Sequence, residues 1–189
     1  GLPSEMGGQL VQSLGDAGYG PNDINYLLIT HGDYDHIGGL SNFTSAQIVL
    51  PSHAYDLWIE DTEGMVEEFM KLMRDGMTAA EAETQAAGRR AYREVLVQLN
   101  SQGRIRLVRC GEDILPGLRF IDAPGHRRDH VAVEIESDGQ LLLHVVDAFR
   151  HELQLTRHDF YCLFDSYPET LAETMVVLMD RSVERGALV

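Results

Sequence analysis

The densest group of chemically active side chains in the sequence lies between positions 31 and 36. Two histidines and two aspartates fall within these six positions: His31, Asp33, Asp35 and His36. Imidazole and carboxylate groups bind zinc, manganese or iron. A loop that leaves a strand can turn the first pair toward one point and the second pair toward another point nearby, so this segment predicts two adjacent metal ions. The alternative is a glycine-flanked turn whose carboxylates cap the next helix.

Two later segments carry groups of the same kind. Residues 123–126 read Ala-Pro-Gly-His, which places His126 in a tight loop shortly before Asp129 and His130. An apolar run that begins at Leu141 ends at Asp147. Alone, either segment is weak evidence, because a single His or Asp at a strand end is usually a hydrogen-bonded or capping group.

The hydrophobic pattern predicts the elements that position these side chains. We expect strands at 24–30, 46–50, 105–108, 118–121, 131–135 and 141–146, with a hairpin turn at 137–140. We expect helices over 6–17, from 51 onward, over most of 60–100 and from 168 onward. The segment 31–36 and Asp147 each directly follow a strand. Helices and strands alternate early and strands pair late, which predicts an α/β fold.

Composition limits the classes of protein that the chain can represent. The 189 residues include 15 Lys and Arg against 30 Asp and Glu, a net charge of −15, and 44% are hydrophobic. This predicts one soluble domain with a real core and opposes binding to nucleic acid. No apolar run approaches the roughly 20 residues that a membrane span needs, and no secretory signal is visible, so we expect a cytoplasmic protein. Cys110 and Cys162 form no metal or disulfide motif and are expected to be reduced and buried.

Together the three polar segments resemble the metallo-β-lactamase superfamily of metal-dependent hydrolases, in order and over nearly the whole chain. The His-x-His-x-Asp-His signature of the family is similar to Thr30–His36, its Pro-Gly-His to Pro124–His126, and its apolar strand closing on Gly-Asp to the strand before Asp147. The resemblance implies an αββα sandwich of two mixed β-sheets flanked by helices, with a single domain over residues 1–189. The branch it resembles most holds lactonase-like and phosphotriesterase-like hydrolases with a helical insert, here at about 60–100.

The resemblance also implies a role for each matching residue. The first metal ion would be bound by His31, Asp33 and His126, the second by Asp35 and His36, and Asp147 would bridge them. Asp35 would also be catalytic, because it would orient the nucleophile or shuttle its proton. Two divalent ions, by resemblance zinc, would lower the pKa of a bound water toward about 7 and polarise a carbonyl. The implied reaction is attack of metal-bound hydroxide on an ester, a lactone or a similar small substrate.

The sequence departs from the family pattern in three places. Asp33 stands where the family usually has His, which adds harder oxygen character and admits iron or manganese. Val146 stands where the family usually has Gly, which changes how closely the backbone approaches the site. The family's N-terminal strands and its C-terminal strand with a last His ligand have no counterpart around 1–3 and 187–189. Such a chain would expose apolar surface that a homodimer would cover.

These departures leave several functions open. The alternatives are a thioester hydrolase resembling glyoxalase II, an iron redox relative of the same fold and a truncated, catalytically silent domain. We expect a small-molecule substrate and no nucleic-acid or membrane partner. The other histidines are expected to be structural or exposed, namely His53, His144, His151 and His158, whereas His130 is expected to support the metal ligands from behind.

Overall fold

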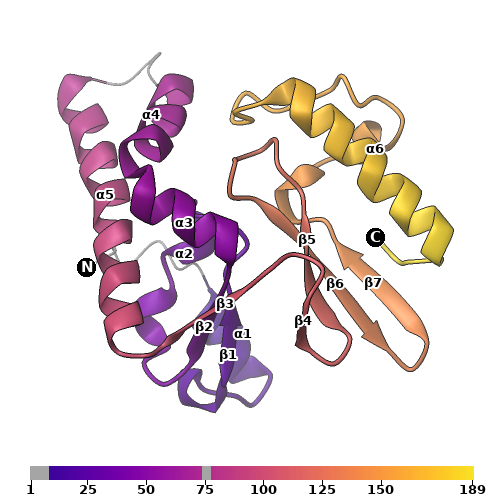
Figure 1. Ribbon diagram of the computed structural model, residues 1–189, viewed down its shortest axis with the longest axis horizontal. Coiled ribbons are helices and arrows are strands. Elements are labelled where there is room, and N and C mark those ends of the chain that lie inside the picture. Colours follow the sequence, from indigo (N-terminus) through magenta and orange to yellow (C-terminus); the bar gives the residue numbers. More distant parts are fainter. Residues whose placement is uncertain (1–8, 74–77) are drawn as a thin grey trace.

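A computed structural model describes residues 9–73 and 78–189, in which two sheets pack against each other with helices on their outer sides (Figure 1). The strands are β1 (Tyr26–Leu28), β2 (Gln47–Pro51), β3 (Ile105–Val108), β4 (Asp113–Leu115), β5 (Leu118–Asp122), β6 (Val131–Ser137) and β7 (Gln140–His144). The α-helices are α1 (Leu10–Asp16), α2 (Tyr34–Ile37), α3 (Ser52–Glu60), α4 (Thr62–Met73), α5 (Ala79–Ser101) and α6 (Pro168–Arg185). Short 3₁₀ turns lie at Pro21–Asp23, Leu40–Asn42, Val146–Ala148 and Glu152–Leu155.

The first sheet is parallel, in the order β1-β2-β3. Its central strand is buried on both faces, as the continuous apolar run predicts. Ile48 and Leu50 pack in a cluster with Trp58 of α3 and Leu96 of α5, whereas Val49 faces the other sheet. Successive side chains of β2 therefore point to opposite faces: Ile48 and Leu50 contact the outer helices, and Val49 contacts the second sheet.

The second sheet is antiparallel, in the order β4-β5-β6-β7. Phe120 and Val133 turn toward the first sheet, and Leu143 turns outward to pack with Met175 of α6. Asp138 and its neighbour Gly139 both have positive φ in the turn between β6 and β7, as the predicted hairpin requires. Leu188 makes a parallel bridge to Leu142 at the edge of β7, so this sheet is mixed at that point.

The expected two-sheet sandwich flanked by helices is confirmed, with corrections to individual elements. The strand predicted over 141–146 ends at His144, because Val146 has a φ of +53° that no strand accommodates. The strand β4 was not predicted. The predicted insert consists of α4 and α5, and residues 6–8 of the first predicted helix and residues 74–77 lie outside the described residues. Both thiols are free, as expected, but half-buried instead of buried.

The two sheets are connected by a hydrogen bond just before the polar segment 31–36, which follows β1 of the parallel sheet. The amide of Val131, the first residue of β6, donates to the carbonyl of Thr30 at 3.1 Å. This bond brings the segment 31–36 beside the loops that precede β6 and follow β7. Among the described helices, none is both long enough and apolar enough to cross a membrane.

Candidate metal centre

The backbone between the first two predicted ligands is fixed by a buried carboxylate. Oδ2 of Asp129 accepts a hydrogen bond from the amide of Gly32 at 2.9 Å and another from Nε1 of Trp58 at 2.8 Å. The Trp58 ring packs so closely on Gly32 that a Cβ there would overlap it. Glycine is therefore required at this position, and the tight contact holds His31 and Asp33 in place on either side.

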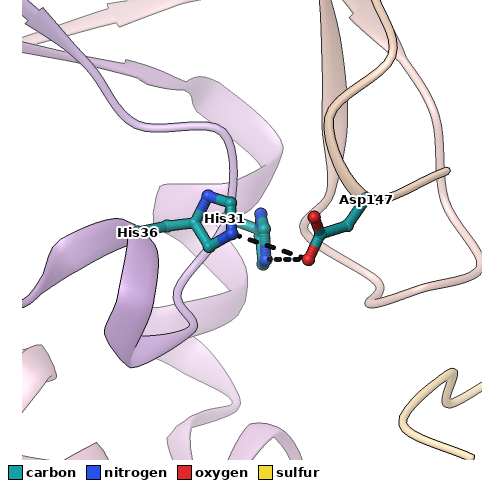
Figure 2. Close-up of side chains that lie close together, drawn as sticks. All are labelled: His31, His36 and Asp147. Atoms are coloured by element: carbon teal, nitrogen blue, oxygen red, sulfur yellow. Dashed lines mark ion pairs between the residues drawn. The ribbon is translucent and has the colours of Figure 1, made fainter. Parts of the chain in front are cut away.

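His31, His36 and Asp147 form one trio of potential ligands, in which both rings face the carboxylate (Figure 2). Oδ2 of Asp147 lies 3.7 Å from Nε2 of His31 and 3.5 Å from Nε2 of His36. Nε2 of His31 is buried and has no hydrogen-bond partner in the described part of the chain. A buried polar atom without a partner is costly, and a metal ion between these atoms would satisfy it.

His31 also belongs to a second trio, with Asp33 and His126. Nε2 of His126 lies 3.2 Å from Oδ2 of Asp33 and 3.4 Å from Oδ2 of Asp147, so the two trios are contiguous. The other ring nitrogen of His126 lies 2.9 Å from the buried carboxylate of Asp165. Such a contact fixes the orientation of a ligating imidazole. We call the five residues of the two trios the central centre.

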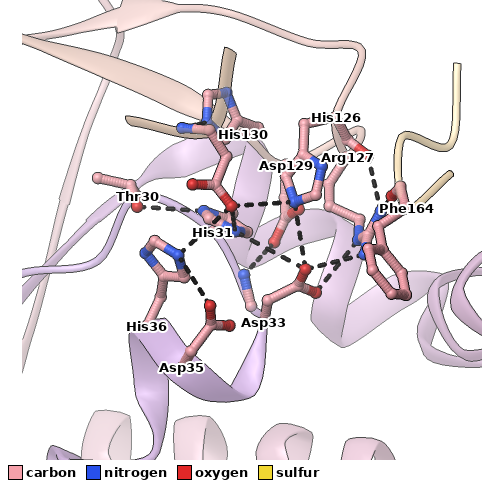
Figure 3. Close-up of polar contacts among 12 residues, drawn as sticks. Thr30, His31, Asp33, Asp35, His36, His126, Arg127, Asp129, His130 and Phe164 are labelled. Carbon is pink, nitrogen blue, oxygen red and sulfur yellow. Dashed lines mark hydrogen bonds and ion pairs between the residues drawn. The ribbon is translucent and has the colours of Figure 1, made fainter. Parts of the chain in front are cut away.

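Arginines balance the negative charge of the central centre, and Figure 3 shows one of them, Arg127, beside Asp33. Asp33 lies 2.8 Å from the guanidinium of Arg127 and 3.2 Å from that of Arg89, and both arginines are buried. Burial alone would raise the pKa of Asp33, but the hydrogen bond from His126 and the Arg127 charge hold it well below its usual range. Arg150 similarly pairs with Asp147 at 3.2 Å and with Asp165 at 2.7 Å.

His130 supports the centre from behind, as expected from the sequence. Its Nδ1 lies 2.7 Å from the carbonyl of Ala123, and its Nε2 accepts the backbone amide of Asp147 at 3.2 Å. Burial lowers the pKa of His130 to about 4, so the ring is neutral at ordinary pH. A neutral ring with one donor and one acceptor suits these two bonds and fixes the backbone at Asp147.

Asp35 lies apart from the two trios. Its side chain is 79% exposed, and Oδ2 is 3.6 Å from Nε2 of His36. The other predicted ligands come together, namely His31, Asp33, His36, His126 and Asp147. The supporting residues Arg89, Arg127, Arg150 and Asp165 were not predicted. Arg89 and Asp165 lie 56 and 39 residues from Asp33 and His126, the residues they contact, and no motif in the chain marks these two.

A pocket of about 370 Å³ opens beside the centre. Its lining includes the predicted ligands Asp33, Asp35, His126 and Asp147, together with the arginines described above and the aromatic rings of Tyr34, Phe69 and Phe164. A larger cavity of about 520 Å³ lies beside the start of α6, and none of the predicted ligands lines it. A further pocket of about 410 Å³ is lined by His36 and Asp147, so two pockets border the centre, and the first holds more of the predicted ligands.

The donor set of the central centre suits a divalent transition-metal ion. Imidazole and carboxylate groups converge, the ligating rings have fixed orientations, and the orphaned nitrogen of His31 points among them. With two sheets between helices and this cluster at the ends of their strands, the molecule has the form of an αββα metallohydrolase.

Comparison with known proteins agrees with this class. The profile of the metallo-beta-lactamase superfamily matches residues 1–143, and the chain belongs to that superfamily. A "probable metallo-hydrolase" of Mycobacterium tuberculosis (strain ATCC 25618 / H37Rv) is 25% identical over 154 residues, which are 79% of this chain and 44% of that protein. The N-acyl homoserine lactonase AiiA of Bacillus thuringiensis subsp. kurstaki is 24% identical over 146 residues, or 76% and 46%. The chain thus spans less than half the length of these relatives.

Solved structures show the same fold. The dizinc quorum-quenching lactonase AidC superposes with a TM-score of 0.77 at 18% identity, covering 95% of this chain and 60% of AidC. The hydrolase AbOPH superposes with a TM-score of 0.74 at 20% identity, with the same coverage. Divalent metal use is therefore a property of the family and the structural neighbours of this chain.

Proposed function

We propose that this chain is the metal-binding part of a hydrolase that opens an ester or lactone bond in a small molecule. The observation that carries the proposal is the convergence of His31, His36 and Asp147 around an orphaned imidazole nitrogen. Asp33 and His126 extend the ligand set, which supports the proposal of the two ions that the resemblance implies. Zinc is the proposed metal, in keeping with the donor set.

A divalent ion held in this centre would polarise a substrate carbonyl and lower the pKa of water. The chain's own residues do the rest. Arg150 lies beside Asp147, lines the pocket and can donate to the carboxylate that ester or lactone hydrolysis produces. Asp35, exposed beside His36 and also in the pocket wall, can pass a proton between the site and solvent.

The small pocket and its aromatic walls support a substrate of modest size. Several relatives are N-acyl homoserine lactonases, which makes lactones the first substrates to test. The thioester hydrolase, the iron redox protein and the silent domain are the other outcomes. The homodimer and the cytoplasmic location stay predictions.

The test combines elemental analysis of the purified chain with hydrolysis of a matched lactone and thioester. Bound zinc together with lactone hydrolysis that is lost on chelation and restored by zinc would support the proposal. Preferential thioester hydrolysis would favour the glyoxalase II-like alternative. Bound iron with a redox-sensitive absorption would replace hydrolysis with redox chemistry, and bound metal without turnover of either substrate would identify a silent domain.

A further inference from the structure

A second group of potential metal ligands shares no residue with the central centre. His53 lies near the start of α3, Cys110 follows the end of β3, and Asp122 is the last residue of β5. One potential ligand atom of each residue lies within 4.8 Å of those of the other two. We call these three residues the lateral cluster.

The His53 ring lies between its two neighbours. Sγ of Cys110 is 4.0 Å from Nδ1, and Oδ1 of Asp122 is 3.8 Å from Nε2. A metal ion binds only one of the two ring nitrogens, so these two distances do not describe a single ion; one ligand atom from each residue nevertheless lies within 4.8 Å of the other two. Neighbouring ligand atoms around a tetrahedral zinc ion lie about 3.3 to 3.6 Å apart, given the usual zinc–ligand distances, so the cluster has to contract to bind one. The side chain of Asp122 is 62% exposed, so a small rotation can bring its carboxylate into such a geometry.

One nitrogen of His53 has no hydrogen-bond partner among the described residues. Nε2 is buried from solvent, yet it makes no hydrogen bond within the described residues. The same nitrogen lies 3.8 Å from Oδ1 of Asp122, beyond hydrogen-bond distance. Since buried polar atoms are usually satisfied, an absent ligand explains this one.

The thiol of Cys110 keeps its proton in the absence of a cation, and an ion that binds here has to displace that proton. Burial raises the pKa of Cys110 to about 11, and the negative charge of Asp122 adds to the increase. A protonated thiol beside a carboxylate is a poor nucleophile, which argues against a Cys-His-Asp catalytic triad. A bound divalent cation would favour the thiolate and offset the carboxylate charge.

Further carboxylates lie near His53. A pocket of about 330 Å³ is lined by His53 and by three acidic residues of α3 and its end, Asp56, Glu60 and Asp61. This negative rim attracts cations and repels anions. An anionic ligand is therefore disfavoured at this surface.

We propose that His53, Cys110 and Asp122 bind a thiophilic divalent cation of the zinc class, separately from the central centre. Cys110 binds as the thiolate and releases its proton to solvent, His53 binds through one ring nitrogen, and Asp122 binds through one carboxylate oxygen. Sulfur, nitrogen and oxygen ligands select such an ion over magnesium or calcium. The ion would link the parallel sheet, through β3 and the β2–α3 junction, to β5 of the antiparallel sheet.

Cobalt(II) provides the test, because it replaces zinc and absorbs strongly in the near ultraviolet only when a thiolate binds it. The central centre contains no cysteine, and the chain has only two, so the charge-transfer band reports on Cys110 or Cys162 alone. The full chain is titrated with cobalt(II) chloride, and the band is then displaced with zinc. We expect one thiolate-bound cobalt per chain.

Matched variants assign the band. Cys110→Ser should abolish it, His53→Gln should weaken cobalt binding by more than about 100-fold, and Cys162→Ser should leave it unchanged. Circular dichroism confirms that each variant is folded. Absence of the band from the unmodified chain, or its persistence in folded Cys110→Ser, would overturn the proposal. Neither result depends on hydrolase activity, so failure here is distinct from failure of the proposed function.

Discussion

The central centre and the lateral cluster use similar ligands in opposite electrostatic surroundings. In the central centre, Asp33 is held by two buried arginines, and Asp147 is paired with Arg150. In the lateral cluster, the ion pair recorded for Asp122 among residues 9–73 and 78–189 is with His53 alone. Protein cations thus balance the central carboxylates even before a metal ion is bound. No arginine or lysine pairs with Asp122 in the described part of the chain. A metal ion bound there would therefore change the protonation of Cys110 and the net charge of the cluster.

The largest expected effect comes from the residue shared by both central trios. His31→Ala should reduce kcat/KM by about 10³-fold, because metal chemistry contributes several kcal/mol to the barrier. It should also lower the metal content while sparing the cobalt–thiolate band, as two independent sites require. His151→Ala, which removes an exposed histidine outside both sites, is the control. Loss of the band together with the activity would mean that the two sites are coupled.

The second prediction tests whether Arg127 stabilises the buried negative charge of Asp33. Arg127→Met should lower the free energy of unfolding by about 3 kcal/mol, because it leaves Asp33 buried with one partner fewer. Arg90→Met removes an exposed ion pair with Glu63 and should change the free energy of unfolding far less, because solvent screens this pair. Urea denaturation measures both. Equal losses of unfolding free energy in the two variants would mean that Arg127 stabilises the buried Asp33 no more than Arg90 stabilises an exposed glutamate.

A smaller effect concerns the lateral thiol in the absence of metal. A pKa raised from 9.0 to about 11 leaves about 100-fold less thiolate at pH 8, and the greater nucleophilicity of that thiolate restores about tenfold. Cys110 should therefore react about tenfold more slowly with a disulfide reagent than an ordinary thiol. Because the pKa is raised, its rate should keep rising tenfold per pH unit beyond pH 9.

Stopped-flow rates on the Cys162→Ser variant isolate the reaction of Cys110. Zinc should protect the thiol further. A rate that levels off near pH 9, or one that zinc leaves unchanged, would mean that Cys110 is an ordinary surface thiol and would remove the contrast with the central centre.

The sequence predicted the parts of the molecule that are set by local order along the chain. His31 and His36 follow a strand within one short motif, so their position at a common site could be expected from spacing, although the sequence assigned them to different metal ions and the structure places them in one trio. Arg89 could not, since it reaches Asp33 from a helix 56 residues later and nothing near it marks that contact. His53 was expected to be structural, because imidazole often serves as an ordinary hydrogen-bonding group, and its neighbours Cys110 and Asp122 come from distant segments. Tertiary pairs between distant segments leave no periodic signal in a single sequence.

The smallest expected change in the free energy of unfolding comes from the backbone conformation next to Asp147. Asp122 ends a strand in regular register with Val131, whereas Asp147 follows Val146, a β-branched residue with a φ of +53°. A left-handed conformation costs such a residue about 1–2 kcal/mol, and glycine avoids this cost while losing about 0.5–1 kcal/mol to chain entropy. Val146→Gly should therefore stabilise the fold by about 0.5 kcal/mol, measured by urea denaturation. Asp138→Gly, at a similar positive φ, should gain less, because Asp tolerates this conformation. A loss of stability in Val146→Gly would show that packing of the valine side chain outweighs the strain, and the central carboxylate would then be held no differently from the lateral one.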